Sequence, residues 1–263
     1  TGSENTAVGF EALDAATTAE NNVAIGRLAG TGLTTGGSNT IVGAAAMQTN
    51  STGVGNVAIG ISALAVAQGS DNVAVGRTAG DAVTTGANNV LMGTDAGGSL
   101  TTGGNNTVIG KDAFAAATTV TSAVAVGFKA LASNTSGTGN TALGYAAGED
   151  ITTAVQNVLV GYHAGTNLTT GNNNVFIGYG TGDACTTGTP NTAVGVGAYG
   201  SNTGGAENTA IGNSTLALSQ SDSFYNTAIG STAGYDVTTG DYNTFLGRYA
   251  GTTVTTGSFG IMI

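Results

Sequence analysis

Polar and apolar positions recur along this chain about every 17 residues, as in proteins built from stacked repeats. Each repeat contains a short motif, usually Asn-x-x-aliphatic-Gly, in which an apolar stretch ends at a glycine. These glycines are Gly9, Gly26, Gly43, Gly60, Gly76, Gly93, Gly110, Gly127, Gly144, Gly161, Gly178, Gly195, Gly212, Gly230 and Gly247. Residues are therefore placed below in columns, counted from this glycine as position 0.

The three residues before each glycine predict a short β-strand. Position −3 is Thr or Val, position −1 is always aliphatic, and position −2 is mostly Ala. β-branched residues at alternate positions are typical of a strand with a buried face. Because column −2 is apolar as well, both faces of the strand are expected to be covered. The coil interior would cover one face, and another chain would cover the face of column −2, which a monomer would leave exposed.

Positions +4 and +7 vary together. Seven repeats carry a bulky residue at +4 and Ala, Asn or Ser at +7, whereas eight carry Gly at +4 and an aliphatic residue or Cys at +7. We infer one interior slot that is filled from either position, as close packing requires. A single repeat cannot bury a core alone, but stacked repeats can. The sequence therefore predicts an all-β fold, a β-solenoid of about fifteen 17-residue coils, packed or intertwined as a homotrimer. Residues 1–263 are expected to form a single array within a longer chain.

An asparagine column precedes the strands. Position −4 is Asn in fourteen repeats and Ala123 in the other. The asparagines are Asn5, Asn22, Asn39, Asn56, Asn72, Asn89, Asn106, Asn140, Asn157, Asn174, Asn191, Asn208, Asn226 and Asn243. Such a column predicts a structural ladder in which each amide bonds to the coils on either side. Thr-Thr-Gly at −9 to −7 predicts the opposite turn, with its glycine at positive φ.

Charge and composition narrow the classes of function. Fifteen acidic residues against five basic ones give a net charge of −10. This balance disfavours nucleic acid and anionic membranes as partners, because both require clustered Lys and Arg. The sequence also has no apolar run long enough for membrane insertion.

The sequence offers no catalytic, cofactor or metal site. The single histidine, His163, lies at the outward +2 position, which argues against His-based catalysis. Cys185 occupies the aliphatic +7 column, which predicts a buried structural thiol. The letters G-x-G-x-x-G at 195–200 have no following helix, and the acidic residues lack calcium-loop spacing. We therefore expect that the protein is not an enzyme.

An aromatic column is the candidate binding site. Phe128, Tyr145, Tyr162 and Tyr179 occupy +1 in four successive repeats. An exposed aromatic ladder suits stacking on sugar rings. The alternative is that these rings only cover the coils or lie between chains. The Thr-Thr pairs suggest ice binding as a further alternative, because flat threonine ladders can order water. Adjacent threonines point to opposite sides of a strand, however, and the column is interrupted, so the pattern argues against it.

The segments NTAVGFEAL, NVAIGRLAG and NTALGYAAG resemble the head repeats of trimeric autotransporter adhesins. They also resemble the arrays of phage tail fibres that end in an intramolecular chaperone. The likeness covers essentially the whole chain. It implies a trimeric shaft or head of a fibre that is extracellular, on a cell surface or on a virion, and that binds a host glycan or protein receptor. A self-assembling extracellular filament without a receptor is the alternative.

Overall fold

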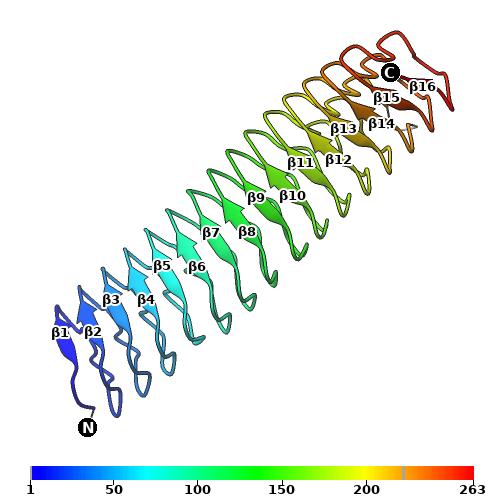
Figure 1. The fold of residues 1–263 in the computed structure, drawn as a ribbon. Helices are drawn as coiled ribbons and strands as arrows, with labels where there is room; N and C mark the ends of the chain where they lie inside the picture. The colour runs from blue at the N-terminus through cyan, green and yellow to red at the C-terminus, as the bar shows by residue number, and fades with distance from the viewer. Residues whose placement is uncertain (1, 221–222) are drawn as a thin grey trace. The chain divides into compact units, whose positions relative to one another are not determined.

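The computed structural model describes residues 2–220 and 223–263, and the regular elements in these ranges are all short parallel β-strands (Figure 1). The prediction of an all-β solenoid is confirmed. The chain divides into two units, Thr1–Ser136 and Gly137–Ile263, which are built from the same coil.

Each coil contributes one short strand. The first unit contains β1 (Thr6–Val8), β2 (Val23–Ile25), β3 (Thr40–Val42), β4 (Val57–Ile59), β5 (Val73–Val75), β6 (Val90–Met92), β7 (Thr107–Ile109) and β8 (Val124–Val126). The second contains β9 (Thr141–Leu143), β10 (Val158–Val160), β11 (Val175–Ile177), β12 (Thr192–Val194), β13 (Thr209–Ile211), β14 (Thr227–Ile229), β15 (Thr244–Leu246) and β16 (Ile261–Met262). Within each unit every strand pairs in parallel with the next strand along the chain, so equal columns lie side by side.

The strand ends at position 0 because only glycine fits there. All fifteen of these glycines have φ between 126° and 146°, a backbone conformation that residues with a Cβ rarely adopt. A Cβ on Gly26 would lie only 2.6 Å from the carbonyl oxygen of Gly43 in the next coil. The backbones of successive coils therefore touch directly along this column.

The two faces of the strand are the reverse of what the sequence suggested. Column −2 points inward and is fully buried in β2–β15: Ala24, Ile41, Ala58, Ala74, Leu91, Val108, Ala125, Ala142, Leu159, Phe176, Ala193, Ala210, Ala228 and Phe245. The expectation that column −2 faces another chain is thus wrong. The inward column −2 holds side chains from Ala to Phe, whereas the Thr and Val side chains of column −3 and the aliphatic side chains of column −1 lie on the outer face.

The interior slot shared by +4 and +7 is confirmed. Leu64 at +4 and Val83 at +7 are both fully buried. A Cβ added to Gly80, the +4 glycine of the coil that follows Leu64, would lie 3.2 Å from Leu64 Cδ2 and 3.3 Å from Val83 Cγ2. Column −2 shares this slot, since a Cβ on Gly182 would lie 2.6 Å from the ring of Phe176. Three columns therefore share one volume.

The asparagines at −4 join the coils by a ladder of buried side chains. Asn174 Nδ2 donates to Asn157 Oδ1 at 3.1 Å and to the Gly188 carbonyl at 2.8 Å. Its Oδ1 accepts from the backbone N–H of Asn191 at 2.9 Å. One amide thus satisfies polar groups of the coil on either side. In the first unit, Ala123 adds no side-chain bond of its own.

The Thr-Thr-Gly turn differs from its prediction. Its glycines do not lie at positive φ. Glycine is needed there because the next coil is too close for a side chain: a Cβ on Gly188 would lie 2.6 Å from the carbonyl oxygen of Gly205. Positive φ occurs instead at positions −5, +2 and +4, as at Ser38 (59°), Ala45 (57°) and Met47 (46°). The first threonine of the pair hydrogen-bonds to the next coil: Thr101 Oγ1 donates to the Thr118 carbonyl at 2.9 Å.

Cys185 is expected to resist alkylation in the folded protein. Its side chain is fully buried, and burial raises the pKa of the thiol to about 11. At pH 8 the thiolate fraction alone makes the reaction with iodoacetamide about a hundredfold slower than that of an ordinary thiol. Mass spectrometry of native protein against urea-unfolded protein measures the difference. Equal rates in the two samples would contradict the buried position.

Candidate functional site

Three tyrosines of the +1 column stand in a stack on the second unit. The rings of Tyr145 and Tyr162 are 4.9 Å apart at 11°, and those of Tyr162 and Tyr179 are 5.2 Å apart at 5°. The parallel strand register brings them together, because it repeats each column at the spacing of hydrogen-bonded strands. The three rings are 45%, 45% and 60% exposed. The predicted aromatic ladder is therefore present at the surface for these three residues.

Phe128, the fourth predicted member, belongs to the first unit, where two lysines lie over its ring. The ammonium groups of Lys111 and Lys129 lie 5.6 Å and 5.8 Å from the centre of its ring. Two cations over an aromatic ring form favourable cation–π contacts. The sequence pattern alone did not predict these contacts with Lys111 and Lys129.

Stacking changes what the tyrosine ladder offers to a ligand. Tyr162 has a tyrosine ring on each side, so its faces are occupied and its edge points to solvent. Stacking on sugars needs a free ring face. Tyr179 is the last ring of the ladder, because the next coil carries Val196 at +1. Among the described residues no aromatic ring stacks on the Tyr179 face directed toward Val196, which makes it the candidate face for a ligand.

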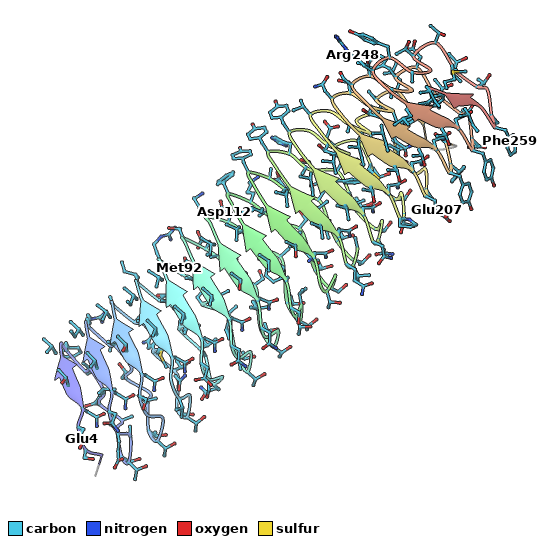
Figure 2. All side chains as sticks on the ribbon, in the orientation of Figure 1. Glu4, Met92, Asp112, Glu207, Arg248 and Phe259 are labelled. Atoms are coloured by element: carbon cyan, nitrogen blue, oxygen red, sulfur yellow. The ribbon has the colours of Figure 1, made fainter. Side chains whose placement is uncertain are left out.

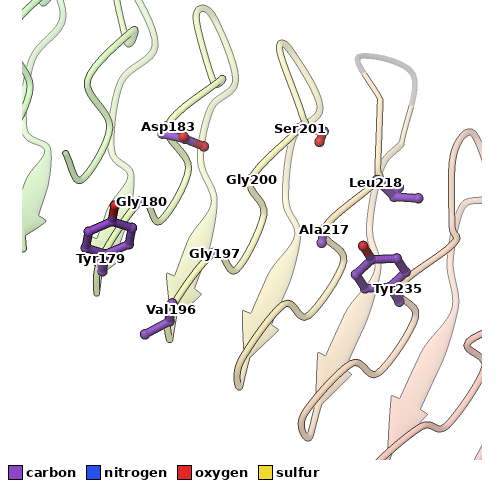
Figure 3. A pocket seen from close by; sticks show the side chains of 10 residues that line it. All are labelled: Tyr179, Gly180, Asp183, Val196, Gly197, Gly200, Ser201, Ala217, Leu218 and Tyr235. Atoms are coloured by element: carbon purple, nitrogen blue, oxygen red, sulfur yellow. The ribbon is translucent and has the colours of Figure 1, made fainter. Parts of the chain in front are cut away.

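A pocket of about 370 Å³ lies beside this face (Figure 3). Tyr179 and Tyr235 stand at its two ends, and the backbone of Gly197 and Gly200 runs between them. The glycines of the G-x-G-x-x-G letters, which made no nucleotide motif, thus form part of a pocket floor. Sequence reasoning missed this pocket, although consecutive glycines at +2 in two coils signal it.

Asp183 is the charged group of the pocket. It is half-buried, and burial raises the pKa of its carboxyl above the ordinary value, against the opposing effects of backbone hydrogen bonds and of His163. His163 itself lies half-buried against the tyrosine ladder, 4.3 Å from the ring centre of Tyr162, and its Nδ1 is 3.0 Å from Thr166 Oγ1. A carboxylate beside an aromatic ring gives the pocket an acceptor for hydroxyl groups.

A second aromatic stack, also missed from the sequence, occupies column −5 of the second unit. Tyr225 and Tyr242 are 4.7 Å apart, and Tyr242 and Phe259 are 5.0 Å apart. All three are exposed and have φ between 57° and 61°, which is unusual for bulky residues. Their recurrence at the repeat period is the signal that would have found them. In Figure 2, Phe259 projects from one edge of the coils and Arg248, of column +1, from the opposite edge.

The described residues contain no group of three or more His, Cys, Asp or Glu side chains placed to hold a metal ion. In that same part of the chain, no helix has the length and apolar character needed to span a bilayer. No protein-family model matches the sequence, and a search of curated proteins gives no significant match.

Proposed function

We propose that this chain is a structural segment, a shaft or head, of an extracellular or virion fibre, and that it assembles as a homotrimer. Three copies of a regular solenoid would hold binding surfaces away from a cell or particle and add avidity. The fibre would present these surfaces for adhesion or attachment to a host.

The exposed apolar strand face is the observation that carries this proposal. Column −1 is exposed over much of each unit: Val8, Ile25, Ile59, Met92 and Ile109 in the first, and Leu143, Ile177, Ile211, Ile229 and Leu246 in the second. Contiguous apolar surface of this kind marks association in soluble proteins. It also lies on a regular parallel sheet, so a second copy of the chain meets the same row of side chains at the same spacing.

The first experiment is the absolute mass by light scattering across dilution. We expect three times 25.2 kDa at all concentrations. A stable monomer would contradict the trimer. A mass that grows without limit as concentration rises would favour the alternative, a self-assembling filament without a receptor.

Acidic substitutions test which face associates. Ile59→Glu with Ile109→Glu is expected to yield a folded monomer, because both side chains are 38% exposed and a buried interface would not accept two charges. Thr85→Glu with Thr102→Glu adds the same charge at the exposed opposite turn and serves as the control. A strand-face variant that keeps the wild-type mass would show that columns −3 and −1 are not the interface.

A further inference from the structure

We infer that the pocket between Tyr179 and Tyr235 binds a short, neutral, linear oligosaccharide that lies along the direction in which the coils stack. This inference rests on the proposed adhesive function and names the class of ligand. The tyrosine ladder then serves as a support for its last ring rather than as the binding surface itself.

The hollow exists because two coils lack a side chain that their fold would accept. Position +2 has positive φ in every coil, yet thirteen of the fifteen coils carry a non-glycine residue there. The two glycines, Gly180 and Gly197, are neighbours in successive coils. The nearest atom to a Cβ on either of them would be 3.8 Å away, an ordinary contact. Thirteen coils carry a side chain in this conformation and the space beside both glycines is open, so glycine is favoured here but not required, and the bare backbone forms the pocket floor.

The two tyrosines set the length of the ligand. Tyr179 at column +1 and Tyr235 at column +5 lie three coils apart in the second unit, which corresponds to about 14 Å along the stacking direction at the usual strand spacing. This span exceeds one sugar ring and suits an oligosaccharide of about two or three. The apolar C–H face of a pyranose packs on an aromatic face. Tyr179 offers its unstacked face at one end, and the half-buried Tyr235 closes the other (Figure 3).

Polar groups of the pocket favour a neutral sugar. The Asp183 carboxylate lies beside the floor: Oδ2 is 3.8 Å from where a Cβ on Gly180 would stand, and Oδ1 is 3.6 Å from that of Gly200. An ionised carboxylate only accepts hydrogen bonds, so it pairs with sugar hydroxyls and repels acidic groups. The net charge of −10 acts in the same direction. Ser201, exposed at the rim, adds a hydroxyl that both donates and accepts.

The pocket is formed before a ligand arrives. Backbone bonds between coils hold its floor: Ala184 N donates to the Gly200 carbonyl at 3.2 Å, and Ser201 N to the Ala217 carbonyl at 2.9 Å. Leu218 N likewise donates to the carbonyl of Tyr235 at 3.1 Å. A preformed floor spares the ligand the entropy of ordering a loop.

Isothermal titration calorimetry with defined trisaccharides tests the inference. The neutral set is maltotriose, cellotriose and triacetylchitotriose, and 3′-sialyllactose is the acidic comparison. We expect at least one neutral trisaccharide to bind and sialyllactose to bind at least tenfold more weakly. Gly197→His fills the floor at a column where His163 already occurs with φ of 55°, and should weaken binding at least tenfold. Ala45→His, at the same column of the first unit, should leave it unchanged.

Two tyrosine variants separate the pocket from the ladder. Tyr179→Ala should weaken binding at least tenfold, whereas Tyr145→Ala, at the same column two coils earlier, should change it less than threefold. No binding by any neutral trisaccharide, or equal losses for the two variants, would overturn the inference. Such results would not change the mass measured by light scattering. The experiments therefore distinguish a wrong ligand inference from a wrong proposal of a trimer.

Discussion

Gly178→Ala should destabilise the protein by about 2–6 kcal/mol, or prevent its folding, because it adds backbone strain and overpacking together. Gly178 has φ of 139°, and an added Cβ would lie 2.6 Å from both the Gly195 carbonyl oxygen and Thr181 Oγ1. A strained backbone costs about 1–3 kcal/mol and overpacking about 1–3 kcal/mol more. The neighbouring coil cannot move aside easily, because its own glycine is hydrogen-bonded on the sheet: Gly195 N donates to the Ile177 carbonyl at 2.8 Å.

The control lies two positions away in the same coil. Gly180→Ala should cost only about 1 kcal/mol, the usual penalty of a left-handed conformation. Thermal unfolding followed by circular dichroism compares the variants with the wild type, and soluble yield serves where Gly178→Ala does not fold. Equal effects of the two substitutions would mean that the coils do not touch at column 0.

Asn174→Ala should lower the free energy of unfolding by about 2–6 kcal/mol, because it leaves two buried polar groups unsatisfied. The change removes the amide that bonds the buried Gly188 carbonyl and the backbone N–H of Asn191. Each buried polar group left unsatisfied costs about 1–3 kcal/mol. Urea titration measures the loss.

The adjacent asparagine provides the comparison for this variant. Asn173 is exposed at column −5 with φ of 60°, so Asn173→Ala should cost about 1 kcal/mol or less. A loss for Asn174→Ala no larger than that for Asn173→Ala would show that the ladder contributes little to stability. The chain already carries Ala123 at the same column of the first unit, so one missing asparagine is compatible with the fold. We therefore expect Asn174→Ala to lower stability without unfolding the whole protein.

The candidate site was predictable only in part. The repeat period placed Tyr145, Tyr162 and Tyr179 in one column, and parallel register made their proximity a necessary result. The orientation of the rings was not predictable. Stacking of the tyrosine rings decides whether their faces or their edges are exposed to solvent. Because the rings stack face to face, the candidate binding site is the pocket beyond Tyr179 rather than the ladder itself.

By itself, the sequence determined the repeat, the position of each strand, the asparagine column and the interior slot shared by +4 and +7. These features follow from period and from compensation between columns, which are visible without coordinates. Only the tertiary structure decided which face of the strand is inside. Alternation separates two faces but does not say which one the returning chain covers. In β4 the returning chain covers Ala58 and leaves Val57 and Ile59 on the outer face, where Ile59 is 38% exposed.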